Sequence, residues 1–249
     1  EISLGLVGSE MCIRDRYISV VFFTKTYYTI HGVESVSVDK EDAMRKKSHI
    51  SLAKHIVQIS DIKNFDEHKK AFYIGSILPD CKPSFLTKRH EITGTFDLVE
   101  KGMYKLTQGY HRMDELSTMY FTKLGEVMHY IADYFTFPHN KEYPGTMKQH
   151  CVYEGQLKHK LREYIGNLNE RDMKRWWSGL QLDDLNRFTS VADICDFLKE
   201  EHRRYIRRGT HSVEEDCKYI VGICSKVAFA ILHVCKLAMI PEPVYVTVH

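Results

Sequence analysis

The sequence predicts an all-α protein, built as a single compact multi-helix domain. Apolar residues recur at the three- and four-residue spacing of helices through most of the chain after Met44. No segment after Met44 shows the alternation of apolar and polar residues that is typical of a strand. With 249 residues, 43% of them hydrophobic and 27% charged, the chain has the composition of one globular domain with a substantial core.

The first predicted helix covers residues 49–59. Ser48 is a favourable N-cap for it, and apolar residues follow at helical spacing. A second, short helix is predicted at 65–76. The segment 78–84 contains two prolines, so we expect a loop there, which continues through 90–94.

A long helix is predicted at 115–135, and it carries a continuous apolar side. Pro138 should end it, because proline lacks the backbone donor and clashes with the preceding turn. Helical patterns also cover, in chain order, residues 97–109, 148–168, 171–179, 191–206 and 213–238.

The N-terminal region, residues 1–43, is expected to be a non-native or disordered leader, with the domain at 44–249. Residues 7–15 read VGSEMCIRD, and the stretch up to residue 16 resembles a translated sequencing-library adapter. Lys40–Met44 can be encoded by AAG GAG GAT GCN ATG, which contains a bacterial ribosome-binding sequence before a start codon. We therefore predict that translation starts at Met44. The alternative is an ordinary N-terminal arm.

Charge and hydropathy argue against several classes of protein. The net charge of +2 gives no electrostatic case for nucleic-acid binding. We expect no transmembrane segment, since no apolar run reaches the length that spans a bilayer. Residues 17–23 are apolar but end near Lys25 without a cleavage site, which makes a poor signal peptide. The predicted location is cytoplasmic, or secreted if the true N-terminus is missing.

The cysteine pattern argues against a thiolate metal site. There are seven cysteines, and no two are spaced as C-x-x-C. We expect buried free thiols in a reducing compartment.

Histidines and carboxylates are spaced as paired ligands. His129 and Asp133 lie four residues apart in the long predicted helix, and so share one face. His150 and Glu154 repeat this spacing in the next helix, and His139 lies between the two pairs. The other candidates are His49 at the start of the first helix and Asp80 and His90 in the proline-rich loop.

Each pair alone is more often a structural pair than a ligand pair. Together they offer nitrogen and oxygen donors without cysteine, and zinc sites of this kind are usually catalytic. Clustered zinc ions polarise a phosphoryl oxygen and generate hydroxide near neutral pH. These residues are therefore candidate ligands of a zinc centre that could hydrolyse a phosphate ester, and their order along the chain strengthens that hypothesis.

This order resembles that of the bacterial zinc-dependent phospholipase C family, which includes alpha-toxin-like enzymes. The most specific match is LGEVMHYIAD at 124–133 with FPH at 137–139, which fits H-Y-x-x-D-x(5)-H with a nearby proline. The weaker matches are Ser48-His49, YIGSILPD at 73–80, KRH at 88–90 and HCVYE at 150–154. The resemblance implies an all-α fold of the phospholipase C/P1 nuclease type and a phospholipid substrate at a membrane surface.

The resemblance also implies the ligand sets. One zinc ion would be held by Asp80, His90, His129 and Asp133, and a second by His139, His150 and Glu154. His49 with Asp133 would supply part of a third site, and Asp80 would contact the nucleophilic water. Family members complete the third site with the amino group of an N-terminal tryptophan, which this chain lacks before His49. We therefore expect two tightly bound Zn²⁺ ions and a weaker third.

Two other functions stay open at this point. An S1/P1-like nuclease or nucleotidase has a similar metal cluster and needs aromatic residues beside the metals to stack bases. Tyr130, Tyr134, Phe135 and Phe137 are the candidates for that role. A non-catalytic metal-binding domain is the second alternative, and it would leave no open position for water.

Overall fold

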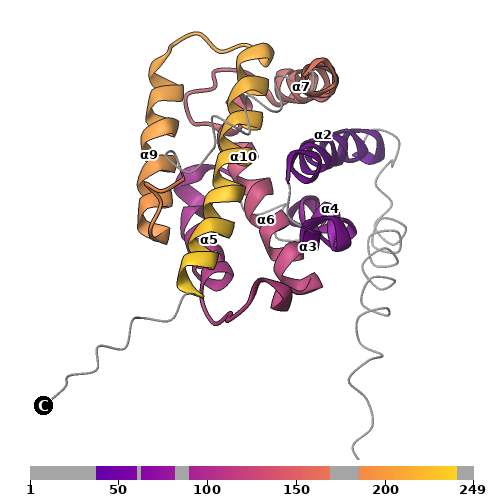
Figure 1. Ribbon diagram of the computed structural model, residues 1–249. Coiled ribbons are helices and arrows are strands. Elements are labelled where there is room, and N and C mark those ends of the chain that lie inside the picture. The colour runs from indigo at the N-terminus through magenta and orange to yellow at the C-terminus, as the bar shows by residue number, and fades with distance from the viewer. Residues whose placement is uncertain (1–37, 61–62, 82–89, 169–184, 240–249) are drawn as a thin grey trace, which may run out of the picture. The chain divides into compact units, whose positions relative to one another are not determined.

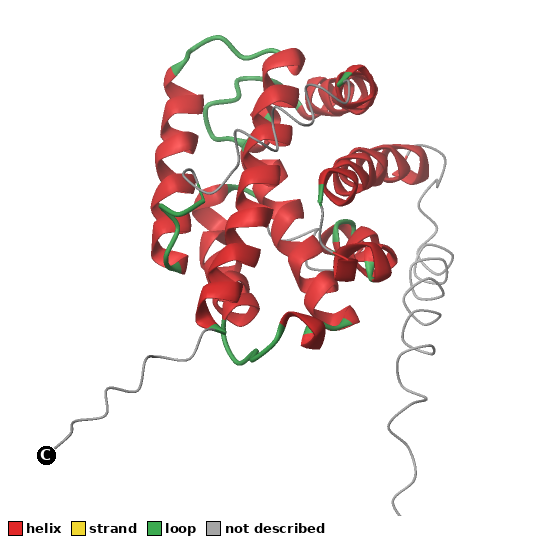
Figure 2. Cartoon of the chain, viewed as in Figure 1, coloured by secondary structure: helices red, strands yellow, loops and turns green. Residues whose placement is uncertain are grey.

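The computed structural model describes residues 38–60, 63–81, 90–168 and 185–239 (Figure 1). Throughout these ranges every regular element is an α- or 3-10 helix and none is a strand (Figure 2). The all-α prediction is confirmed. The chain divides into two compact units, Glu1–Glu41 and Asp42–His249. The helices described below belong to the second unit from Asp42 onward, and the predicted leader at 1–43 stays a prediction.

The first helices differ from their predicted bounds. Helix α2 (Val38–Ile59) begins well before residue 49. Ser48 therefore lies inside the helix, and its predicted N-cap role was wrong. The residues before Ser48 include Lys, Glu, Ala, Met and Arg, which are strong helix formers and extend the helix. The predicted second helix is split into α3 (Lys63–Glu67) and α4 (Lys69–Gly75).

The proline-rich segment contains one turn of 3-10 helix, η1 (Pro79–Cys81). Helix α5 (Ile92–Thr107) follows, so residues 92–94 are helical and not part of a loop as predicted. A short 3-10 helix, η3 (Met113–Glu115), precedes helix α6 (Thr118–Tyr134). Helix α6 ends before Pro138, as expected, and Pro138 lies in the turn of η4 (Phe137–His139).

The last three helices lie close to their predicted bounds: α7 (Met147–Asn167), α9 (Val191–Arg207) and α10 (Val213–Ala238). Helix α7 begins at a capping box formed by Thr146 and Gln149, and α9 at one formed by Ser190 and Asp193. The predicted helix at 171–179 lies outside the described residues.

Helices α6 and α10 form the centre of the second unit. Helix α6 packs against α4, α5 and α10, and α10 also packs against α5, α7 and α9 (Figure 1). Helix α10 is long and apolar enough to cross a membrane by length and composition alone, and 72% of its most apolar window is buried in the protein. A helix surrounded by other helices is apolar on all sides, which accounts for this composition.

Six of the seven cysteines lie in the described residues. Cys81 and Cys151 are half-buried, and Cys195, Cys217, Cys224 and Cys235 are buried. Burial raises the pKa of Cys195 to about 12, so this thiol is uncharged at neutral pH. Cys12 lies outside the described residues.

Two glycines allow α4 and α6 to touch through their backbones. A Cβ atom on Gly75 would collide with the Thr122 carbonyl oxygen. A Cβ atom on Gly125 would collide with the Phe72 carbonyl and stand 2.7 Å from the Ser76 amide nitrogen. This close approach brings the end of α4 to the face of α6 that carries His129, one turn after Gly125.

Gly125→Ala should therefore destabilise the protein by about 1–3 kcal/mol or more, because neither backbone can move without separating the two helices. Gly166→Ala is the matched control. Gly166 is exposed in α7, and a methyl group added there would meet no atom, so alanine should stabilise the protein by about 0.5–1 kcal/mol. Chemical denaturation measures both changes, and equal effects would contradict close packing of α4 on α6.

His55 is a buried imidazole outside the predicted site. It is 2% exposed, and neither ring nitrogen has a hydrogen-bond partner among the described residues. Burial lowers the pKa of His55 from 6.5 to about 4. The folded protein therefore resists protonation of this ring, and stability is lost as the pH falls below 6.5.

His55→Leu should remove the loss of folding stability that His55 causes at low pH. At pH 4 the penalty is about 3 kcal/mol, at 1.36 kcal/mol per unit of pKa shift. We expect the difference in unfolding free energy between variant and wild type to grow by this amount from pH 7 to pH 4. Urea denaturation at the two pH values tests it, and a constant difference would show that His55 protonates normally.

Candidate metal centre

Helix α6 places two ligand-type side chains inside the protein. His129 is 1% exposed and Asp133 is 4% exposed, and apolar residues of the same helix are buried on either side of them. Because buried charge is costly, such side chains require partners. The partners come from other helices.

All eight predicted site residues lie in one connected cluster. His49 comes from α2, Asp80 from η1 and His90 from the residues just before α5. His139 comes from η4, and His150 and Glu154 from α7. Three sets of residues have ligand atoms within 4.8 Å of one another: His49, Asp80 and His129; His90, His129 and Asp133; and His139, His150 and Glu154.

Asp133 connects these sets. Its Oδ2 atom lies 2.8 Å from His90 Nδ1, 3.2 Å from His129 Nε2 and 3.8 Å from His139 Nδ1. Its Oδ1 atom lies 3.5 Å from His49 Nε2. One buried carboxylate therefore faces imidazoles from four different segments of the chain.

A backbone carbonyl group fixes the orientation of the His129 ring. Its Nδ1 donates to the Ser76 carbonyl oxygen at 2.8 Å, at the end of α4. A carbonyl oxygen only accepts, so Nδ1 carries the proton and Nε2 faces the cluster. Metal-binding histidines are commonly held in this way by a carbonyl behind the ring.

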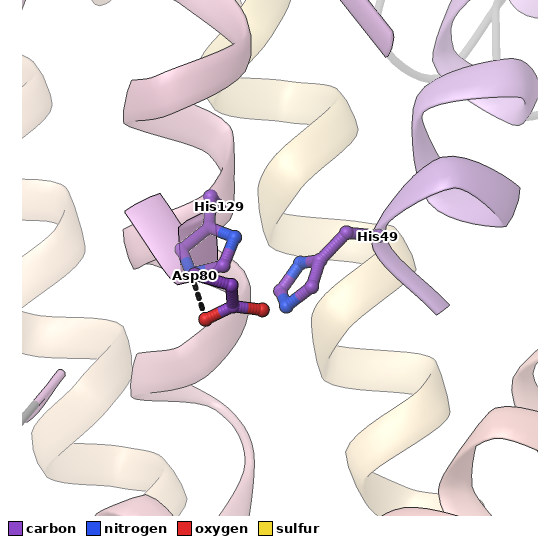
Figure 3. A group of neighbouring side chains, drawn as sticks. All are labelled: His49, Asp80 and His129. Atoms are coloured by element: carbon purple, nitrogen blue, oxygen red, sulfur yellow. Dashed lines mark ion pairs between the residues drawn. The ribbon is translucent and has the colours of Figure 1, made fainter. Parts of the chain in front are cut away.

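His90, His129 and Asp133 form the first group, and its surroundings fit a cation. His129 Nε2 lies 3.1 Å from His90 Nδ1, so two imidazole nitrogens face each other beside the Asp133 carboxylate. The Asp80 carboxylate lies beside the rings of His49 and His129, which stack on each other with ring centroids 4.0 Å apart, and its Oδ1 is 3.4 Å from His129 Nε2 (Figure 3). The other oxygen, Oδ2, is buried and has no hydrogen-bond partner in the described part of the chain. Buried polar atoms are rarely left unpaired, and a metal ion between these donors would satisfy them.

Without a metal, protons balance the buried carboxylates. Burial acts to lower the pKa of His129, but Asp80 and Asp133 outweigh it and raise the pKa well above its ordinary value. Burial lowers the pKa of His49 to about 4, with the nearby His129 adding to the effect. A metal ion would take over the role of the proton on His129.

The second group consists of His139, His150 and Glu154. The Oε1 atom of Glu154 lies 3.0 Å from His139 Nε2 and 2.9 Å from His150 Nε2. The three side chains are between 10% and 17% exposed, so the group lies near the surface but is shielded. Two histidines and a glutamate are one of the ligand sets of catalytic zinc, which leaves a position for water or substrate.

A pocket opens beside both groups. It has about 460 Å³ of empty volume, part of it open solvent, and His49, Asp80, Asp133, His139 and Glu154 line one part of it. Its other lining residues are mostly apolar: Leu52, Ala132, Leu157, Leu161 and Ile220.

The structure brings together the residues of the implied ligand sets. Asp80 Oδ1 lies 3.4 Å from His129 Nε2 and 3.9 Å from His90 Nδ1, and Asp133 Oδ1 lies 3.5 Å from His49 Nε2. Asp80 also forms one of the three sets with His49 and His129. The assignment of each side chain to an ion stays a prediction.

Two supporting groups were not found from the sequence. The Ser76 carbonyl is a backbone atom, which no residue pattern marks. Asp216 is a fully buried carboxylate in the first turn of α10, and it resembles an ordinary acidic residue at a helix N-terminus.

The chain matches the sequence profile of one protein family. Residues 48–212, more than half of the chain, match zinc dependent phospholipase C. The chain therefore belongs to the zinc-dependent phospholipase C family, a family of hydrolases. No curated protein and no solved structure matches the chain.

Proposed function

We propose that the protein hydrolyses phosphodiesters of phospholipids at a zinc centre, releasing diacylglycerol and the phosphorylated headgroup. The observation that carries this proposal is the pair of histidine–carboxylate groups joined by Asp133 at the edge of one pocket. Membership of the zinc-dependent phospholipase C family supports the same reaction class.

The side chains divide into metal-holding and water-contacting roles. His90, His129 and Asp133 would hold one zinc ion, and His139, His150 and Glu154 a second. When bound, zinc lowers the pKa of water toward neutrality and polarises a phosphoryl oxygen. Asp80 lines the pocket, and its Oδ2 atom, which has no hydrogen-bond partner among the described residues, can accept a hydrogen bond from the attacking water and orient it.

The pocket lining favours a lipid over a nucleic acid. Leu52, Leu157 and Leu161 offer an apolar surface to the glyceride part of a phospholipid. None of the Phe, Tyr or Trp side chains in the described ranges lines the pocket. Tyr134 and Phe135, two of the candidates for base stacking, are fully buried in the core.

The test is a substrate panel on the zinc-loaded full-length protein. It contains vesicles of phosphatidylcholine, phosphatidylethanolamine or phosphatidylinositol, together with single-stranded DNA and RNA. We expect diacylglycerol from at least one vesicle type, loss of activity with a chelator and recovery with Zn²⁺. Nucleotide release without lipid cleavage would favour the nuclease alternative. Zinc binding without turnover of any substrate would favour the non-catalytic alternative.

A further inference from the structure

Asp216 is a buried carboxylate that belongs to neither metal-ligand group. It is 0% exposed and lies in the first turn of α10. Burial raises the pKa of Asp216 to about 6, even though three donors oppose that rise. An apolar residue at position 216 would avoid the cost of burying a carboxylate. The hydrogen bonds that Asp216 accepts must therefore offset this cost.

The contacts of Asp216 lead to the second metal group. Its Oδ2 atom accepts the backbone N–H of Phe137 at 2.9 Å and the hydroxyl of Tyr153 at 2.8 Å. Phe137 begins η4, which carries His139, and Tyr153 precedes Glu154 in α7. One oxygen atom therefore connects the two segments that supply the second group.

The third contact of Asp216 leads elsewhere. Its Oδ1 atom accepts the hydroxyl of Tyr205 at 2.7 Å, and Tyr205 lies on α9, which supplies no ligand of either group. The Asp216 carboxylate thus accepts two hydrogen bonds from segments that carry ligands of the second group and one from a helix that carries none. Loss of the Tyr205 hydroxyl is therefore a matched control for loss of the Tyr153 hydroxyl.

We propose that Asp216 is a positioning residue for the His139–His150–Glu154 zinc site: it fixes η4 against α7 through Phe137 and Tyr153. The three ligand side chains of that site come from these two segments. Because Phe137 of η4 and Tyr153 of α7 both donate to Asp216 Oδ2, that oxygen sets the distance between the two segments. This distance allows His139 and His150 to contact Glu154. The proposal rests on the proposed function, because it assumes that this group binds zinc.

Zinc affinity tests the proposal directly. Wild-type protein, Tyr153→Phe and Tyr205→Phe are loaded with zinc and titrated with a metal chelator, with zinc bound per chain as the readout. Each of the two variants loses one tyrosine hydroxyl that donates to Asp216 and keeps the aromatic ring. We expect Tyr153→Phe to bind one of its two zinc ions about 10-fold or more less tightly than the wild type does, the range found for outer partners of metal ligands. Tyr205→Phe should release both ions as the wild type does.

Two Asp216 variants extend the test. Asp216→Ala should lose the second zinc and keep the first. Asp216→Asn should restore much of the affinity, because its amide oxygen can still accept from Phe137 and Tyr153 while its NH₂ group faces the Tyr205 hydroxyl. If Asp216→Ala does not fold, the two tyrosine variants still decide. Circular dichroism and thermal unfolding of the zinc-free proteins identify that case.

The outcomes separate this inference from the proposed function. Equal zinc affinity in Tyr153→Phe and wild type, or equal losses in both tyrosine variants, would overturn the positioning role and leave the zinc hydrolase intact. A wild-type protein that binds no zinc would overturn both proposals.

Discussion

Asp133→Ala should reduce phosphodiester hydrolysis to the uncatalysed background. Asp133 is the residue whose carboxylate faces His90 and His129 of the first group and also His139 of the second. Its removal takes away one ligand and leaves Asp80 as the remaining carboxylate beside the buried imidazoles of His90 and His129. Loss of an outer partner costs about 10–100-fold in metal affinity, and loss of a ligand shared by the centre should cost more. Zinc content and diacylglycerol release, measured on the same preparation, give the result.

His159→Ala is the matched control for Asp133→Ala. His159 is exposed on α7, five residues after Glu154, and it belongs to none of the ligand groups. This variant should keep its zinc and its activity within about twofold of wild type, since exposed substitutions away from special features have small effects. Equal losses in both variants would mean that the activity reports general folding, not a site.

Two zinc ions per chain should survive dialysis. Of the three ligand sets found among the described residues, two share His129, whose Nδ1 is occupied by the Ser76 carbonyl. Its remaining nitrogen binds one ion, so only two sets can be filled completely at the same time. A third ion would rely on His49 and on oxygens that the first site also uses, whereas catalytic zinc usually has three protein ligands.

Elemental analysis of the dialysed full-length protein counts the ions. We expect about two zinc ions per chain, with a third present only before dialysis. Three retained ions would show that another group completes the site around His49. Fewer than two would contradict the division into two groups.

The fold was predictable where periodicity was strong. The bounds of α10 follow from an unbroken apolar pattern after Ser212, which accepts the Glu215 amide as N-cap. The start of α2 was missed because Ser48 is a favourable N-cap that the continuous helix passes over. Local capping preference was outweighed there by the helix-forming residues before it.

The site was predictable as a set of residues but not as an arrangement. The i, i+4 pairs His129–Asp133 and His150–Glu154 and the order of the other ligands marked all eight side chains. The position of Asp80 beside His49 and His129 depends on the packing of η1 on α6, which no local pattern encodes. The supporting contacts from Ser76 and Asp216 join residues more than fifty positions apart, and only the folded chain reveals them.

An anomalous-difference map at the zinc absorption edge, from crystals of the zinc-loaded protein, tests the central claim most directly. We predict one peak bonded to His90, His129 and Asp133 and a second bonded to His139, His150 and Glu154. Zinc found at neither group, or only on exposed histidines such as His159, would contradict it.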